Sequence, residues 1–258
     1  MGGAIRKFMT QQNDYIRLFP EYSDVFYDDV DIYRQYFLPL ASVNLQVLYP
    51  GRNEWLHFVS VKEVYDGSVG ENTTAYHTRY TLPDTLGFDV IDGKYRFDAD
   101  WQYFKEHRYI TPNSYHPDHT DAEIAWNMNE AMYQLKKAYY QEFGQLYNGA
   151  FDRPGLLVKD IRKLERLRAL TTADLHADDV DAYIEETRLE KTAGIFTKLA
   201  PGMTPDLEES RIPLREDGQP FDFIGALEGY DFQYTPPDDI SLFYCPSMKK
   251  AVVCLAYS

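Results

Sequence analysis

The densest group of side chains that could do chemistry lies between residues 116 and 123. It holds two imidazoles and three carboxylates: His116, Asp118, His119, Asp121 and Glu123. Imidazoles with nearby carboxylates are ligands for zinc or iron, so one hypothesis is a metal-dependent hydrolase or transferase that uses His116, His119, Asp121 and Glu123. Residues 120–123 also form a capping-box pattern, and acids in a first helical turn favour the helix dipole. We favour capping and expect no metal and no cofactor.

Acidic residues gather in three further clusters: Asp28-Asp29-Asp31, Asp178-Asp179-Asp181 and Asp238-Asp239. Paired carboxylates can perform acid–base catalysis, as in glycosidases. Acids adjacent in sequence on a helix point in different directions, however, which is typical of a solvated face. The chain also lacks the glycine-rich dinucleotide fingerprint, Walker A, His-Glu-x-x-His, Gly-x-Ser-x-Gly and EF-hand patterns. We therefore expect no catalytic residues and lean away from an enzyme.

Charge indicates the kind of partner. The 258 residues include 41 acidic and 26 basic side chains, for a net charge of −15. Direct nucleic-acid binding is disfavoured because neutralising phosphates needs clustered Lys and Arg. The excess of acid is typical of a well-solvated surface. The alternative is a surface that docks a basic protein partner, whose encounter it would accelerate. We assign the contacts to acids expected to be exposed and to two tyrosines beside them: Asp28, Asp29, Asp31, Tyr33, Tyr234, Asp238 and Asp239.

The cysteines and the apolar runs indicate a compartment. Cys245 and Cys254 are too few for a disulfide framework, and their spacing matches no zinc signature, so we expect buried thiols in a reducing cytosol. No apolar run reaches the roughly 18 residues that span a bilayer. The first residues lack the apolar core and cleavage site of a signal peptide. We expect a cytoplasmic protein that makes no membrane contact.

The hydrophobic periodicity predicts the elements that position these residues. Aromatic residues at helical spacing predict a helix over residues 22–36, capped by Ser23 and ended by Pro39. Alternating residues over 42–97 predict an antiparallel meander of four or five strands, including a strand over 75–82. Asp92-Gly93 between two such runs predicts a hairpin. Helical patterns follow over about residues 120–193, and 200–220 is an acidic, Pro- and Gly-rich connection into the last strands.

The last forty residues predict strands that close a sheet. Ile240–Cys245 and Ala251–Leu255 are expected to pair as a hairpin through residues 246–249. The face predicted for Leu242, Tyr244, Val252 and Cys254 opposes the face of Phe243, Val253 and Leu255. Both faces are apolar, so the hairpin is expected inside the protein. The fold class is therefore α+β: an antiparallel sheet of several strands with the helical segment of residues 120–193 packed on it. We expect one domain over 1–258, with a division into 1–118 and 119–258 as the alternative.

Short motifs in residues 198–257 resemble the C-terminal part of the YwqG-like (DUF1963) family. They are Lys198-Leu199-Ala200-Pro201-Gly202, Asp217-Gly218-Gln219-Pro220, Phe223-Ile224-Gly225-Ala226 and Leu242-Phe243-Tyr244. Ala200-Pro201 interrupts the family's glycine pair, and Ala226 stands where the family often has Gln. The resemblance implies a soluble bacterial protein with an antiparallel α+β fold and no established enzymatic activity. It also favours an immunity-type binding role, and it supplies no catalytic residues.

Three functional hypotheses follow. The first is a non-catalytic, acidic, cytosolic binding protein, most specifically an immunity-type inhibitor of a bacterial toxin or effector. The second is the metal-dependent hydrolase or transferase described above. The third is an acidic inhibitor that mimics nucleic acid, which requires carboxylates spaced like phosphates along one face.

Overall fold

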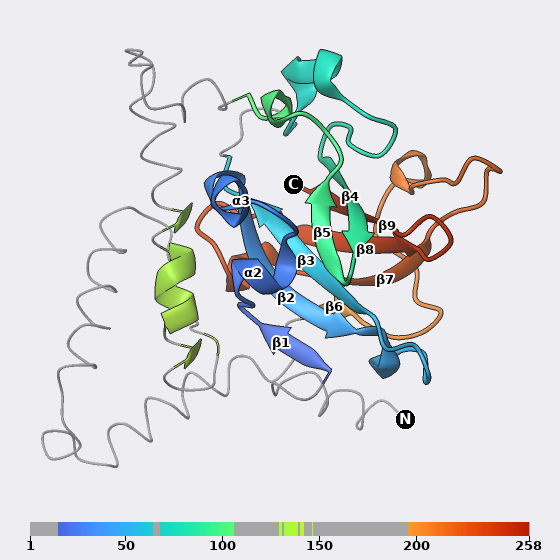
Figure 1. The fold of residues 1–258 in the computed structure, drawn as a ribbon, viewed down its shortest axis with the longest axis horizontal. Helices are drawn as coiled ribbons and strands as arrows, with labels where there is room; N and C mark the ends of the chain where they lie inside the picture. Colours follow the sequence, from blue (N-terminus) through green and yellow to red (C-terminus); the bar gives the residue numbers. More distant parts are fainter. Residues whose placement is uncertain are drawn as a thin grey trace, which may run out of the picture.

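Two antiparallel sheets form the frame of the protein in a computed structural model (Figure 1). The structure describes residues 15–63, 68–105, 129–130, 132–138, 140–141, 146 and 196–257. Sheet A has three strands in the order β1-β2-β3. Their bounds are β1 Ile16–Leu18, β2 Phe37–Asn44 and β3 Trp55–Val61.

Sheet B has six strands in the order β5-β4-β9-β8-β7-β6, so the C-terminal hairpin lies at its centre. Every residue of β2 and all but the two end residues of β9 are buried, as expected for strands covered on both faces. The bounds in sheet B are β4 Thr85–Ile91, β5 Lys94–Phe97, β6 Phe196–Lys198, β7 Asp222–Leu227, β8 Asp239–Cys245 and β9 Lys250–Ala256.

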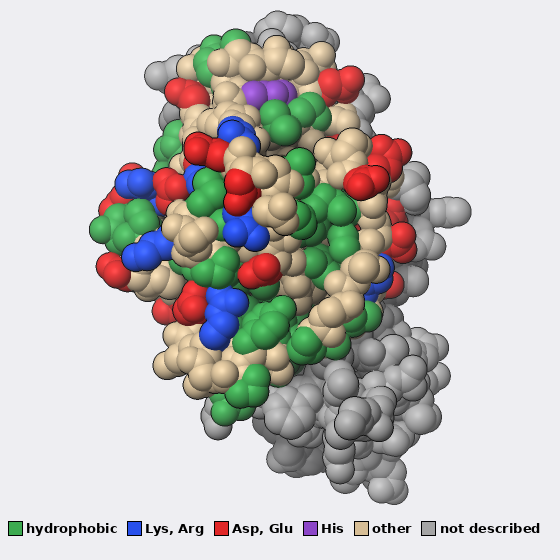
Figure 2. Space-filling view, turned by 90° about the vertical axis from the view of Figure 1, so that its right-hand side faces the viewer, with side chains coloured by type: hydrophobic (Ala, Val, Ile, Leu, Met, Phe, Trp, Pro, Cys, Tyr) green, Lys and Arg blue, Asp and Glu red, His purple; other side chains and the backbone are tan. Residues whose placement is uncertain are grey.

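The helices of the described residues are short. Residues 129–130, 132–138 and 140–141 are also helical. The labelled helices are α2 Tyr22–Val25 and α3 Val30–Tyr36, with 3-10 turns η1 Leu45–Val47, η2 Glu71–Tyr76, η3 Trp101–Tyr103, η4 Glu209–Arg211 and η5 Gly229–Asp231. The connection from β6 to β7 contains η4 and projects to the right of Figure 1 in orange; Figure 2 faces that side of the molecule.

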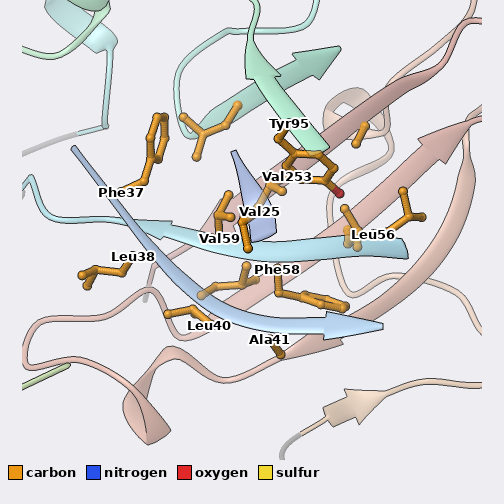
Figure 3. Packing of buried hydrophobic residues seen from close by; sticks show 14 of the residues in the cluster. Val25, Phe37, Leu38, Leu40, Ala41, Leu56, Phe58, Val59, Tyr95 and Val253 are labelled. Atoms are coloured by element: carbon orange, nitrogen blue, oxygen red, sulfur yellow. The ribbon is translucent and has the colours of Figure 1, made fainter. Parts of the chain in front are cut away.

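The main core fills the space between the sheets. Figure 3 shows Val59 of β3 packed with Tyr95 of β5 and Val253 of β9. The Phe37 ring on β2 crosses to sheet B, with ring centroids 5.5 Å from Phe88 and 5.4 Å from Phe97. At roughly 25 cal/mol per Å² of apolar surface, burial of such rings is the main force that holds the two sheets together.

The N-terminal helix differs from its prediction. It is broken between α2 and α3, where Asp28 adopts a left-handed φ of 64°. The side chain of Asp29, not that of Ser23, caps α3 by accepting a hydrogen bond from the backbone N–H of Asp31 at 3.1 Å. The helix ends at Tyr36, and Pro39 lies inside β2. Helical spacing of the aromatics alone does not reveal this break, because both halves bury rings in the same core.

The predicted meander over 42–97 is also wrong in part. β2 and β3 belong to sheet A, whereas β4 and β5 belong to sheet B. The expected strand over 75–82 is absent, because its first residues lie in η2. Thr78 to Thr81 form a turn in which the N–H of Thr78 donates to the carbonyl oxygen of Thr81. The hairpin at Asp92-Gly93 is confirmed, with positive φ of 50° and 77°.

The C-terminal hairpin is confirmed, and both of its faces are buried. β8 and β9 pair antiparallel with Leu242 opposite Val253 and Phe243 opposite Val252. This register corrects the face assignment, because opposed residues share a face. The main core receives Ile240, Leu242, Tyr244, Ala251, Val253 and Leu255. A second, smaller core on the outer face of sheet B receives Phe243, Cys245, Val252 and Cys254.

The predicted α+β class is confirmed in its coarse form, because the described residues form antiparallel sheets and a few helices. Residues 129–141 supply the described part of the predicted helical segment, and the rest of 120–193 lies outside the described residues. Met132 and Leu135 are buried, as their helical spacing predicts. The single-domain assignment and its alternative remain predictions.

Candidate functional site

The first predicted contact cluster lies on an exposed corner between α2 and α3. Asp28, Asp29 and Asp31 are all exposed there. Asp29 caps the helix, and Asp31 forms a surface ion pair with Arg34 at 3.4 Å. Such an exposed pair contributes little to stability, so these carboxylates are accessible to a partner.

Tyr33 is a core residue, which corrects its assignment to the contact surface. Its side chain is 4% exposed, and its ring stacks on Phe26 with a centroid distance of 4.4 Å. Its hydroxyl accepts a hydrogen bond from the backbone N–H of Phe97 at 3.1 Å. Burial raises the pKa of this phenol, and Tyr33 joins α3 to β5 rather than to a partner.

The second predicted cluster is half-buried. Asp239 accepts hydrogen bonds from Ser241 at 2.9 Å and Thr197 at 3.3 Å, and burial raises the pKa of its carboxyl group. Asp238 accepts a hydrogen bond from the hydroxyl of Tyr230 at 2.8 Å. Tyr230 is 54% exposed, an aromatic contact candidate that sequence reasoning missed. Its position after the Gly229 turn was the available signal.

Tyr234 is held by the fold beside this cluster. Its backbone N–H donates to Asn129 Oδ1 at 3.0 Å, and the side chain is half-buried. The two predicted clusters therefore lie on different elements: one is at the start of α3, and the other is at the start of β8, which pairs with β7 and β9.

A second exposed acidic segment is one that the sequence indicated only as a connection. We call residues 206–220, between β6 and β7, the acidic strap. Arg211 and Arg215 are its only basic residues. Its five carboxylates are all exposed: Asp206, Glu208, Glu209, Glu216 and Asp217. Density of acid between Pro and Gly residues was the signal for this surface.

Charge is mixed with apolar surface on the side that carries the strap. Figure 2 shows acidic, basic and hydrophobic side chains interspersed there, without a continuous acidic row. Leu214 and Met248 are exposed at 47% and 36%. This arrangement on one face does not favour the nucleic-acid mimic, which needs a line of carboxylates at phosphate spacing.

The Ser–His pair with hydrogen-bonding geometry is inaccessible. Ser42 Oγ lies 2.7 Å from His57 Nδ1, and His57 Nε2 lies 2.8 Å from the carbonyl oxygen of Gly93. A carbonyl only accepts, so Nε2 carries the hydrogen and Nδ1 accepts from the Ser42 hydroxyl. Both residues are 2% exposed, and burial lowers the pKa of His57 to about 4. The pair joins β2 and β3 to the β4–β5 turn and offers no nucleophile to a substrate.

A charged network beside β4 is likewise internally satisfied. Lys250 Nζ contacts Asp89 at 2.6 Å and Asp98 at 2.9 Å. Asp98 also accepts from the hydroxyls of Thr78 and Thr81. Gly87 is required here, because a Cβ at that position would lie 2.5 Å from the Asp98 carboxylate. The network holds the β4–β9 pair rather than a ligand.

An open cavity of about 420 Å³ lies beside α2. Its lining carries both signs of charge, and Glu21 is already paired with Lys137 at 2.8 Å. The cavity therefore selects no class of ligand. The described residues that line it are Arg17, Leu18, Phe19, Pro20, Glu21, Asp24, Tyr140 and Gln141.

The proposed metal ligands His116, His119, Asp121 and Glu123 lie outside the described residues, as do Asp118 and the cluster at 178–181. Among the residues that the structure describes, no three His, Cys, Asp or Glu side chains are arranged to hold a metal ion. No helix within that same set is long and apolar enough to cross a membrane. Cys245 and Cys254 are both free thiols and buried, as predicted.

Comparison of the chain with protein-family models, curated proteins and solved structures found no match. The resemblance to the YwqG-like family therefore stays a prediction that rests on the short motifs of residues 198–257.

Proposed function

We propose that this chain is a non-catalytic binding protein that docks a basic protein partner through exposed carboxylates. The observation that carries the proposal is a contrast in exposure. Acids at the α2–α3 corner and on the acidic strap face solvent. The Ser42–His57 pair, in contrast, is buried, and the half-buried Lys250 network is satisfied by its own ion pairs. Groups poised for catalysis would need access to a substrate, while contact residues need only a surface.

The frame beneath these acids suits such a role. Two packed sheets with a large aromatic core hold the α2–α3 corner in place, which limits the ordering cost of binding there. A net charge of −15 attracts a basic partner over about a Debye length and accelerates its encounter. Tyr230 adds an exposed ring next to a carboxylate, a combination that receives Arg or Lys side chains well.

The narrower form of the proposal is an immunity-type inhibitor of a bacterial toxin or effector, acting in the cytoplasm. The excess of acid and the YwqG-like motifs support it. An inhibitor of this kind must present a rigid charged face to its target, and it needs no cofactor.

Affinity purification from the source organism tests the proposal. The wild-type protein should retain one basic partner in stoichiometric amount. A variant carrying Asp28→Asn, Asp31→Asn, Glu209→Gln and Glu216→Gln should lose that partner, while Asp222→Asn, which removes an exposed charge on β7, should keep it. Recovery of no stoichiometric partner, or equal recovery by all three proteins, would contradict the proposal.

A further inference from the structure

The acidic strap is attached to sheet B in an unusual way. Each backbone–backbone hydrogen bond found for it in the described part of the chain joins two of its own residues or ties Pro213 to Phe221. Arg211 N–H donates to Glu208 at 2.9 Å, and Arg215 N–H donates to Gln219 at 2.8 Å. The strap therefore forms no backbone hydrogen bond with the strands of sheet B. It can move away from the sheet without breaking the hydrogen bonds between the strands.

Side chains make the attachments of the strap to the sheet and the loop before β4. The guanidinium of Arg211 donates to the carbonyl oxygens of Leu255 at 2.7 Å and Asp84 at 3.2 Å. Arg79 donates to the carbonyl of Arg215 at 3.0 Å from an exposed position. Tyr80 adds a long contact of 3.4 Å to the carbonyl of Leu214, and Lys198 lies 3.9 Å from Asp206.

The strap covers the smaller core on the outer face of sheet B. Leu207 and Ile212 of the strap are only half-buried, yet they pack against a group of fully buried side chains. Cys254 Sγ lies 3.6 Å from the carbonyl oxygen of Arg211, directly beneath the strap. The buried side chains of this core are Tyr80, Phe221, Phe243, Cys245, Val252 and Cys254.

We infer that the acidic strap opens as a unit while the sheet stays intact, and that Arg211 is its latch. Segments with few buried apolar contacts and few backbone hydrogen bonds to the rest of the fold open locally at low free energy. Arg211 holds two carbonyl oxygens with one charged donor group, which is the strongest kind of neutral-acceptor hydrogen bond. When it releases, the half-buried Leu207 and Ile212 remain as apolar anchors, together with the exposed or long contacts from Arg79, Tyr80 and Lys198.

Opening of the strap exposes the smaller core together with the thiols of Cys245 and Cys254. The strap therefore controls access to this apolar surface. The thiols also report the opening. Burial raises the pKa of Cys254 to about 11 in the closed state, so few molecules carry the reactive thiolate. In the open state Cys254 is solvated, so its pKa is no longer raised by burial. Opening therefore increases both the thiolate fraction and the access of a thiol reagent to Cys254. This inference does not depend on the proposed basic partner.

Thiol labelling tests it. In a Cys245→Ser background, Cys254 is the single thiol, and its modification by N-ethylmaleimide is followed by mass spectrometry in native buffer. We expect Arg211→Ala to accelerate labelling at least about tenfold, because it removes two charge-assisted hydrogen bonds. Arg96→Ala is the matched control, since it deletes an exposed arginine paired with Asp89 at the far edge of the sheet. It should leave the labelling rate unchanged.

A second measurement uses the wild-type protein, so it does not depend on any substitution being tolerated. If the strap opens locally, the urea dependence of Cys254 labelling should be much weaker than that of global unfolding, since less surface is exposed. Equal urea slopes for labelling and global unfolding would overturn the inference. So would labelling of a folded Arg211→Ala variant at the wild-type rate.

Discussion

His57 should make the protein sensitive to mild acid. Its ring is enclosed by the Ser42 hydroxyl, the Gly93 carbonyl and the Tyr95 ring, whose centroid lies 4.8 Å away. No carboxylate contributes to its shifted pKa. Burial lowers that pKa from 6.5 to about 4. The Gly93 hydrogen bond opposes this shift in part, and the weaker effects of the Arg17 and Lys94 charges add to it.

The sign and size of the effect follow from proton linkage. The unfolded chain binds the proton at a higher pH than the folded chain, so the stabilisation is complete above pH 6.5 and is lost as pH falls toward 4. At 1.36 kcal/mol per unit, the loss in unfolding free energy from this group is about 2 kcal/mol at pH 5 and about 3 kcal/mol at pH 4. Marginal domain stabilities make that a large fraction of the total.

Urea unfolding between pH 7.5 and 4 measures this loss. Carboxyl groups also titrate in the range, so the informative quantity is the difference between wild type and His57→Gln, which keeps an acceptor and a donor on the side chain. Wild type should lose about 2 kcal/mol more than the variant by pH 5. A ring whose NMR signals titrate near pH 6.5 in the folded protein, or equal pH profiles for both proteins, would refute the reasoning.

Two further outcomes concern the architecture. Deleting Ala251 to Ser258 removes β9 from the centre of sheet B, so the product should be insoluble or molten by near-UV circular dichroism; a cooperative transition near the full-length temperature would show that the strand is peripheral. Asn129→Ala should destabilise by about 3 kcal/mol in chemical denaturation, because Asn129 Oδ1 accepts the backbone N–H groups of Tyr234 at 3.0 Å and Thr235 at 2.9 Å. Gln134→Ala, on the exposed side of the same helix, should cost less than about 0.5 kcal/mol, and equal costs would contradict the role of Asn129.

Local chemistry made part of the fold predictable. Asp92-Gly93 specifies a turn with positive φ whatever lies around it, so the β4–β5 hairpin followed from two residues. The β8–β9 hairpin followed from two apolar runs separated by four residues. Its register did not, because a strand that is apolar on both faces gives no alternation to fix which side faces the main core.

Non-local contacts explain the remaining misses. Assignment of β2 and β3 to a separate sheet depends on the packing of β3 against β8 and β9, nearly two hundred residues away, and no local pattern encodes that choice. The acids around Tyr33 in the sequence predict a surface position, yet its hydroxyl accepts a hydrogen bond from the backbone of β5. Composition alone shows that the strap is acidic, but the exposure of its carboxylates follows from the position of the strap outside the hydrogen-bonded strands.

The association rate with the captured basic partner tests the central claim most directly. Stopped-flow mixing measures the association rate at about 25 mM salt, where the acidic surface is weakly screened, and at about 300 mM salt, where it is strongly screened. We predict at least about a tenfold slower association at high salt, and a similar slowing at low salt for the variant neutralised at Asp28, Asp31, Glu209 and Glu216. Association that is independent of salt and of these four charges would contradict the account.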